Sequence, residues 1–473
     1  MQDTPSGTGK PSGRNRKALI ESLRADHRAA SRKAGSETSP PSSAPRAPAR
    51  IMAYDFSQLA EFRQLQMHRA AADMIGLENP FFRVHDGAGG PTSEIGGKVY
   101  DNFSSYNYLG LNMHPRVRAA ASAALEHYGT SATASRVVAG ERAIHRDLER
   151  ALAELHGTED SVVMVSGHAT NVTVIGHLLG EDDLILTDTL IHNSISEGAR
   201  LSGARKLTFP HGDLDALEDL LSTHRHAHRH VLIVVEGIYS MDGDYPDLPR
   251  LLALKAAHDC WLMVDEAHSI GVMGQAGRGI GEHFGIDAKG VEMWMGTLSK
   301  TMASCGGYIA GSKTLCDYLR ATAPGFVFSV GLSPVLAASA LESCRILLAG
   351  DCDRVARLQE NGRTFRDSAQ AIGLDTGASA GLSVVPVIVG DSVRAVTLSN
   401  RLHDRGILAL PIIYPAVGEK SARLRFFLTS EHSPEQIERA VTATAEEFAA
   451  LKSGSGGFRA LLDSVSQAPP KKG

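Results

Sequence analysis

The amino-acid sequence predicts an α/β protein with a large, mostly parallel β-sheet and a smaller C-terminal α+β domain. Five short apolar runs leave room for a helix between most neighbours. They are continuous instead of alternating, which is typical of strands covered on both faces, as in parallel sheets. The runs lie at residues 162–165, 184–186, 231–235, 261–264 and 293–295. From about residue 336 a long helix, strands at 384–389 and 423–428, and a closing helix from Pro434 predict the second lobe.

Charge and composition exclude several classes of protein. The 473 residues carry 48 Lys and Arg against 53 Asp and Glu, a net charge of −5, which argues against a general nucleic-acid binder. The sequence contains no apolar run of about eighteen residues, so it predicts no membrane-spanning helix. Residues 1–11 lack the apolar core of a signal peptide, so we expect a cytoplasmic protein. Five cysteines without a Cys-x-x-Cys pair predict neither a disulfide framework nor a structural zinc site.

The composition also predicts the domain boundaries. Residues 1–50 hold ten Lys and Arg against four Asp and Glu, with six Pro and eight Ser. We therefore expect a disordered basic tail, within which Lys17–Ala30 has the spacing of a short docking helix. The predicted segments are a tail at 1–53, an N-terminal arm at 54–110, a large cofactor-binding domain at 111–335, a small C-terminal domain at 336–451 and a flexible tail at 452–473.

Polar residues follow three of the predicted strands directly. They are Glu236-Gly237, Asp265 to His268, and Thr297 to Lys300. Since ligands bind outside the carboxyl ends of parallel strands, we expect these three ends to converge on one site. No GxGxxG fingerprint or Walker loop is present, so a nucleotide cofactor is not supported. The segment His224–His230 is interleaved with arginines and predicts a basic surface loop instead of a metal site.

A lysine at a strand end, facing an aspartate and a histidine, has a specific chemistry. A desolvated lysine has a lowered pKa and forms imines, and pyridoxal phosphate is the cofactor that uses such an imine. Lys300 is the candidate lysine, and Asp265 the carboxylate that keeps the ring nitrogen protonated. His268 can reach the phenolate oxygen. The phosphate would meet Thr297, Ser299 and the backbone amides that open a helix at Gly167 and His168. An isolated acidic pair Asp265-Glu266 also occurs in helicases, but those require a phosphate loop.

Five motifs in this order resemble those of the α-oxoamine synthases. They are Ser105–Leu111, Glu236–Asp244, Asp265–Ser269, Gly296–Lys300, and Arg423–Arg425 with Glu431-His432. This family includes serine palmitoyltransferase, 8-amino-7-oxononanoate synthase, 5-aminolevulinate synthase and 2-amino-3-ketobutyrate CoA ligase. The resemblance runs from about residue 54 to 451. It implies a fold-type I, aspartate-aminotransferase-like pyridoxal phosphate enzyme. The implied reaction is a decarboxylative Claisen condensation of a small amino acid with an acyl thioester, giving an α-aminoketone.

The resemblance also implies roles for individual residues around the cofactor. Lys300 matches the Schiff-base lysine and Asp265 the partner of the pyridinium nitrogen. His268 and Ser240 match residues near the ring hydroxyl. His192 matches the histidine that stacks on the ring and polarises the incoming thioester carbonyl.

Substrate binding and assembly follow from the same resemblance. Arg425 matches the arginine that binds the substrate carboxylate, with Arg423 as its competitor. Tyr106 and Asn107 stand where oxononanoate synthases have Asn-Asp, as they do in serine palmitoyltransferases. Ser135 replaces the threonine of the glycine-specific aminolevulinate synthases, which favours alanine or serine over strict glycine. Ser329 matches a residue that reaches the phosphate of the partner subunit, which implies a homodimer with shared active sites.

The acyl donor stays open between coenzyme A and an acyl carrier protein. Gly140–His145, Ser166–Asn171 and Ala323–Leu332 most resemble synthase domains found beside polyketide synthases, where a carrier protein delivers the acyl group. We expect the basic segment Arg14–Lys33 to attract such an acidic carrier. An aminotransferase of the same fold is the alternative function. A non-catalytic partner subunit would lack Lys300, and a DNA-binding regulator would need a helix-turn-helix domain that the N-terminal tail cannot contain.

Overall fold

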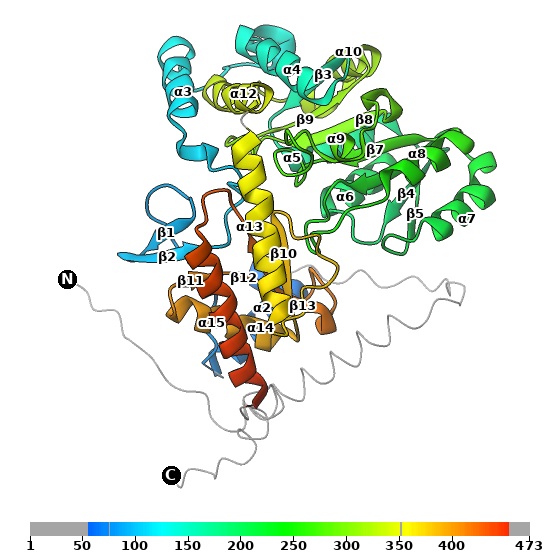
Figure 1. Cartoon of the computed structure of the whole chain (residues 1–473). Coiled ribbons are helices and arrows are strands. Elements are labelled where there is room, and N and C mark those ends of the chain that lie inside the picture. Colours follow the sequence, from blue (N-terminus) through cyan, green and yellow to red (C-terminus); the bar gives the residue numbers. More distant parts are fainter. Residues whose placement is uncertain (1–54, 75, 351, 454–473) are drawn as a thin grey trace. The chain divides into compact units, whose positions relative to one another are not determined.

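The structure is a computed structural model that describes residues 55–74, 76–350 and 352–453 (Figure 1). The chain divides into two compact units. Of the first unit, it describes η1 (Phe56–Gln58) and α2 (Ala60–Met74). The second unit begins at Pro80 and holds all the strands of the described chain. Predictions for the basic tail, its segments Lys17–Ala30 and Arg14–Lys33, and residues 454–473 lie outside the described residues.

A seven-stranded sheet forms the centre of the second unit. Its order is β3-β9-β8-β7-β6-β4-β5. All five predicted apolar runs are strands of this sheet, and its neighbours are parallel except where β9 pairs with β3 and β8. The strands are β3 (Asp160–Met164), β4 (Leu184–Asp188), β5 (Arg205–Phe209), β6 (Val231–Glu236), β7 (Trp261–Asp265), β8 (Met293–Thr297) and β9 (Gly307–Gly311).

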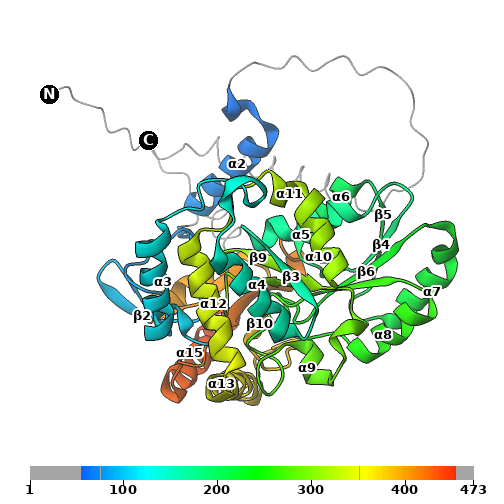
Figure 2. The ribbon, with the colours of Figure 1, turned by 90° about the horizontal axis from the view of Figure 1, so that it is seen from above.

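Helices cover both faces of this sheet, as the continuous apolar runs predicted. In β6, Val231, Ile233 and Val235 join one apolar core, while Leu232 and Val234 join the other. Helices α5 (Gly167–Leu178), α6 (Asn193–Ser202), α10 (Lys313–Thr322) and α11 (Pro324–Val327) contribute to the second core (Figure 2). The opposite face is covered by α3 (Pro115–Tyr128), α4 (Ala143–His156), α7 (Leu214–His224), α8 (Leu248–Ala257), α9 (Ile280–Phe284) and α12 (Pro334–Leu348).

The C-terminal lobe is α+β, as predicted, but it also takes in residues from the N-terminal arm. Strands β10 (Val384–Gly390), β13 (Ala422–Phe427) and β12 (Leu410–Ile412) form one antiparallel sheet. A second sheet joins β1 (Thr92–Ile95) and β2 (Lys98–Asn102) to β11 (Ile407–Leu408). Its helices are α13 (Cys352–Ala371), α14 (Ser392–Asp404) and α15 (Pro434–Ser453).

The long helix predicted from residue 336 is interrupted. Helix α12 ends at Leu348 and α13 begins at Cys352, with Gly350 between them at a φ of 79°. Glycine adopts this left-handed conformation without the steric cost of a Cβ, and so it ends helices. Helix α12 packs on α3 and α4, so it lies with the helices of the large sheet. The boundary at residues 335 and 336 stays a prediction.

The histidine-rich segment has local structural contacts. His224 ends α7 and His228 Nδ1 lies 2.9 Å from its carbonyl oxygen, while the His230 ring stacks on Trp261 at 4.5 Å. Within the part of the chain that the structure describes, no cluster of His, Cys, Asp and Glu is arranged to hold a metal ion. All five cysteines are free, and Cys305 is the exposed one. None of the helices that the structure describes is long and apolar enough to cross a bilayer.

Candidate active site

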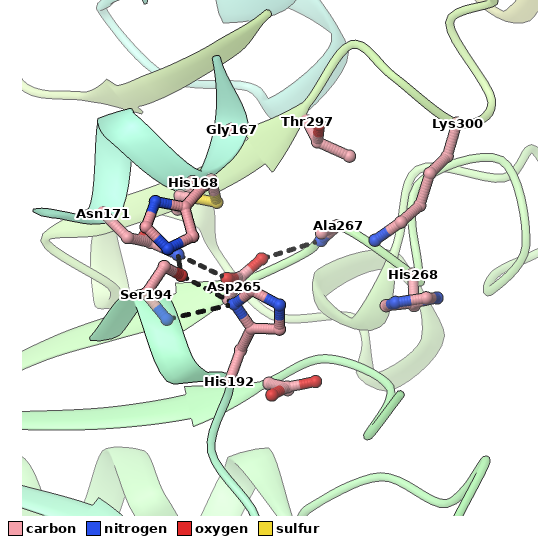
Figure 3. A pocket seen from close by; sticks show the side chains of 12 residues that line it. Gly167, His168, Asn171, His192, Ser194, Asp265, Ala267, His268, Thr297 and Lys300 are labelled. Atoms are coloured by element: carbon pink, nitrogen blue, oxygen red, sulfur yellow. Dashed lines mark hydrogen bonds between the residues drawn. The ribbon is translucent and has the colours of Figure 1, made fainter. Parts of the chain in front are cut away.

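One pocket lies at the carboxyl ends of the central strands, where the sequence predicted that three strand ends converge (Figure 3). Glu236, Asp265 and Thr297 are the last residues of β6, β7 and β8. The ends of β3 and β4 also contribute, through the first residues of α5 and α6. The lining residues are Gly167, His168, Asn171, His192, Ser194, Glu236, Asp265, Ala267, His268, Met295, Thr297 and Lys300.

Asp265 is buried and its carboxylate is held from two directions. Oδ2 accepts a hydrogen bond from Asn171 Nδ2 at 2.9 Å, and Oδ1 accepts one from the Ala267 amide at 3.0 Å. In Figure 3, Asn171 lies on one side of this carboxylate and Lys300 on the other. Asn171 Oδ1 is buried without a hydrogen-bond partner among the described residues. A fixed, buried carboxylate is the group required to keep a pyridinium nitrogen protonated.

Lys300 follows β8 and lines the pocket together with Asp265. Burial lowers the pKa of Lys300 to about 8, although Asp265 and Glu236 oppose the shift. Its Nζ also lies 5.8 Å from the centre of the Tyr106 ring. A lysine with this pKa has a large neutral fraction near pH 8, and the neutral amine is the nucleophile that forms imines.

His268 is a buried histidine with a defined partner. Its Nδ1 lies 2.7 Å from the hydroxyl oxygen of Tyr108. Burial holds the pKa of His268 well below its usual range, and the positive charges of Lys300 and Arg425 add to this effect. The ring is therefore a neutral imidazole that offers one donor and one acceptor. Tyr108 lies within the motif Ser105–Leu111, but no role was predicted for its hydroxyl.

His192 lies at the N-cap of α6, and its protonation can be deduced from its neighbours. The Ser194 amide donates to His192 Nδ1 at 3.3 Å, and the Ser194 hydroxyl lies 2.7 Å from the same nitrogen. Asn171 Nδ2 donates to that hydroxyl oxygen at 2.9 Å, so the hydroxyl can donate onward to Nδ1. The proton of the neutral ring then lies on Nε2. Partial loss of hydration lowers the pKa of His192, which favours this neutral form.

The opposite side of the pocket has the features of a phosphate site. Helix α5 begins at Gly167, so its free amides and positive dipole end face the pocket. A Cβ on Gly167 would lie 2.7 Å from Thr297 Oγ1, so a larger residue would displace the Thr297 side chain. The Thr297 hydroxyl donates to the Gly306 carbonyl and accepts from the Ser299 amide. The Gly167 and His168 amides fit the phosphate group of pyridoxal phosphate, and the Thr297 hydroxyl would join them by turning its hydrogen away from the Gly306 carbonyl.

The two competing arginines of β13 have different surroundings. Arg423 is paired with Asp242 at 2.5 Å and also donates to the carbonyls of Ser421 and Met241. Arg425 donates to the Ser240 carbonyl at 2.9 Å, and its Nε has no hydrogen-bond partner among the described residues. Burial lowers the pKa of Arg425 from its usual value. Arg425 therefore has a free N–H donor with which to bind an anion, whereas the guanidinium of Arg423 is already paired with Asp242.

Glu236 lines the pocket at the end of β6, one of the three strand ends expected to converge there, but no role was predicted for its side chain. Its Oε2 accepts a hydrogen bond from the Ser240 amide, and its Oε1 is buried without a partner among the described residues. Burial, together with repulsion from Asp265, raises the pKa of Glu236 to about 8. The register of the sheet explains the repulsion, because Glu236 and Asp265 are paired residues of β6 and β7.

Several predicted site residues do not line this pocket. Asn107 donates to the Gly89 carbonyl and accepts from the Asn112 amide. The Ser135 hydroxyl donates to the Val327 carbonyl at 2.6 Å. Ser240 contributes its backbone to Glu236 and Arg425. Ser299, Ser329, Tyr106 and Arg425 are also absent from the lining. The roles assigned to all the predicted site residues stay predictions.

Comparisons with known proteins agree with this geometry. The model of the class I and II aminotransferase family matches residues 100–443. An 8-amino-7-oxononanoate synthase from Treponema denticola is 39% identical over 347 residues, which cover 73% of this chain and 87% of that protein. The enzyme of the same name from Symbiobacterium thermophilum is 40% identical over 356 residues, covering 75% and 90%.

Two solved structures of serine palmitoyltransferases are also similar to this chain. The serine palmitoyltransferase of Sphingomonas wittichii has a TM-score of 0.79 at 31% identity, covering 84% of this chain and 99% of that one. A serine palmitoyltransferase structure with PLP as an internal aldimine has a TM-score of 0.79 at 28% identity, with the same coverage.

Proposed function

We infer that this chain, which belongs to the α-oxoamine synthases of the class I and II aminotransferase family, catalyses a pyridoxal-phosphate-dependent decarboxylative condensation. An amino acid and an acyl thioester are joined, carbon dioxide is lost, and an α-aminoketone is released. The observation that carries this conclusion is the meeting of Lys300, Asp265 and the neutral His192 in one pocket. When bound, pyridoxal phosphate supplies an electron sink for negative charge at the amino acid's α-carbon.

The chain's own residues divide the remaining work. Asp265 would face the ring nitrogen, while the amides at Gly167 and the Thr297 side chain would hold the phosphate. Lys300, whose pKa is lowered to about 8, takes the α-proton as general base. His192 presents its Nε2 proton to the thioester carbonyl and so stabilises the oxygen on which negative charge develops. The α-carbon bonds to the thioester carbonyl carbon, and the resulting oxyanion collapses and expels the thiolate. The carboxylate then leaves as carbon dioxide, and Lys300 returns its proton to the α-carbon.

We assign the substrate carboxylate to Arg425. Its pairing capacity and its place beside Phe427, 4.5 Å from the ring centre, support a site for the amino-acid backbone. Alanine, serine and glycine are the candidate amino acids, with alanine or serine favoured by Ser135. Mass spectrometry of the holoenzyme with twenty amino acids and several acyl thioesters tests the reaction. A product of amino transfer to a keto acid, without loss of carbon dioxide, would instead establish the aminotransferase.

We propose that the working unit is a homodimer. Exposed apolar side chains gather on two segments that a short β-bridge between Ser135 and Val330 joins. Val138 is 83% and Phe328 84% exposed, and Val137 lies in the same segment. Because apolar patches of this kind mark interfaces, a second copy is the expected occupant. Ser135 and Ser329 lie on these segments, which supports the proposal that both serines serve the partner's site.

Sedimentation of Phe328→Ser tests the dimer, with Ile372→Ser as the control for an exposed apolar residue elsewhere. Dissociation of the first variant alone is expected. A wild-type chain that sediments as a monomer would contradict the proposal.

The five free cysteines are typical of a reducing compartment, so we place the protein in the cytoplasm.

We also propose that an acyl carrier protein delivers the donor, attracted by the basic residues 1–50. Deleting residues 1–50 is expected to raise KM for a carrier-bound donor and to leave KM for small coenzyme A thioesters unchanged. Equal kinetics for both donors before and after the deletion would remove this role.

A further inference from the structure

His211 lies outside the pocket, in the loop between β5 and α7, and both of its ring nitrogens face carboxylates. Nδ1 lies 2.9 Å from Asp188 Oδ2, and Nε2 lies 2.7 Å from Asp244 Oδ2. The side chain of Asp188 is 1% exposed, that of Asp244 20% and that of His211 27%. The Tyr239 ring packs against the imidazole edge to face at 4.6 Å.

Two carboxylates facing one imidazole require a particular protonation state. A neutral ring has a single N–H, so one carboxylate would face a lone pair; the imidazolium donates to both. Burial alone would lower the pKa of His211, but the bonds to Asp188 and Asp244 raise it to about 10. Asp188, Asp244 and the Tyr239 hydroxyl are the titratable groups whose interactions connect these segments.

These contacts join two segments: the end of β4, which leads to His192, and the loop after β6, whose Ser240 carbonyl holds Arg425. Asp188 ends β4, binds the amides of Leu190 and Gly212, and precedes the turn that leads to His192. Asp244 belongs to the loop that follows β6. Its carbonyl accepts the Tyr239 amide at 2.9 Å, which closes the loop around Ser240 and Met241. The carbonyls of these two residues accept hydrogen bonds from Arg425 and Arg423.

We propose that His211 is a positioning residue that holds the strand end leading to His192 in register with the loop that anchors Arg425. The inference rests on the proposed function, in which His192 serves the acyl thioester and Arg425 the amino-acid carboxylate. Because the His211 side chain is hydrogen-bonded to both carboxylates, it fixes the distance between the two substrate subsites. His211 is not among the residues that line the pocket, and its side-chain hydrogen bonds run to Asp188 and Asp244, through which its effect would pass.

The test replaces His211 with asparagine, which cannot bond both carboxylates as a cation. In the holoenzyme, the Kd for alanine or serine from spectral titration and the KM for an acyl thioester are both expected to rise about tenfold, the scale of one charge-assisted hydrogen bond. Cofactor content per chain should not change. His226→Asn, at an exposed histidine in the loop before β6, is the matched control and should leave both constants unchanged. Substrate constants within twofold of wild type in His211→Asn would overturn the proposal.

Two further measurements do not depend on turnover. The NMR signals of the His211 ring, identified by their loss in the variant, should keep imidazolium shifts up to about pH 9. Titration near pH 6.5 would overturn the assignment. Asp244→Asn keeps His211 and should raise the Kd for the amino acid in the same way; an unchanged Kd would also overturn the proposal. If no thioester reacts with the wild-type enzyme, the proposed function fails, while these two measurements still decide the role of His211.

Discussion

Replacing Arg425 with alanine tests which arginine of β13 binds the substrate carboxylate. The Arg425 guanidinium is held by the Ser240 carbonyl and keeps an unpartnered Nε, so it can bind an incoming anion. A charge-assisted hydrogen bond of this kind contributes about 1.5–3 kcal/mol. The Kd for the amino acid should therefore rise by about 10- to 150-fold. Arg425 forms no ion pair with a carboxylate among the described residues, so its removal should lower the free energy of unfolding less than removal of the paired Arg423.

Arg423→Ala is the matched control, because it removes the same charge two residues away on the same strand. The side chains of Arg423 and Asp242 are only 9% and 18% exposed, and they form an ion pair. Loss of Arg423 leaves Asp242 without its counter-charge, which should lower the free energy of unfolding by about 3 kcal/mol. The effect on amino-acid affinity should be smaller than that of Arg425→Ala. The two variants thus predict opposite patterns.

Spectral titration of each holoenzyme with alanine, serine and glycine gives the Kd, and urea unfolding gives the stability. The KM for the acyl thioester should change far less than the Kd for the amino acid in Arg425→Ala. An unchanged Kd in this variant, or a large rise in Kd in Arg423→Ala with intact stability, would refute the assignment.

Three further variants, with Gly180→Ala as a control, test the cofactor pocket and its surroundings. Lys300→Ala should lower turnover by about a thousandfold or more and abolish the borohydride-sensitive visible absorbance, while thermal unfolding shows an intact fold. Gly167→Ala should raise the Kd for pyridoxal phosphate by about tenfold, because its Cβ would lie 2.7 Å from Thr297 Oγ1 and crowd the helix amides. Gly180→Ala, where a Cβ meets nothing within 4 Å, should leave that Kd unchanged. His211→Asn should lose most stability relative to wild type below about pH 6.5, and the difference in urea unfolding should shrink towards pH 10, since the folded-state pKa of His211 is raised to about 10. A difference independent of pH would contradict this last reasoning.

The strands that the sequence predicted are those whose burial leaves a continuous apolar run. Strand β6 begins Val-Leu-Ile-Val-Val and is buried throughout, so its sequence identifies it as a strand covered on both faces. Strand β5 lies at the sheet edge with an exposed Arg205 and Thr208, and β9 begins and ends with glycine, so neither has this pattern. The break between α12 and α13 was missed although Gly350 is a typical helix-ending residue.

The sequence could predict those site residues that directly follow the parallel strands. A parallel sheet brings the carboxyl ends of its strands to one edge, regardless of how the loops fold. That rule placed Asp265, His268, Thr297 and Lys300 in one pocket. It gives no information about partners that approach from other segments. The hydroxyl of Tyr108 meets His268 from 160 residues away in the sequence, and no local spacing reports such a contact.

Asn171 shows where a sharper prediction was available. It lies four residues after Gly167 on α5, and residues at this spacing occupy the same helix face. Once Gly167 is assigned to the pocket, the next polar residue on that face is expected to point into it as well. Its single amide then donates to both Asp265 and Ser194, and Ser194 in turn sets the proton on His192. The carboxylate that would face the cofactor ring and the imidazole that would face the thioester are therefore oriented by the same side chain.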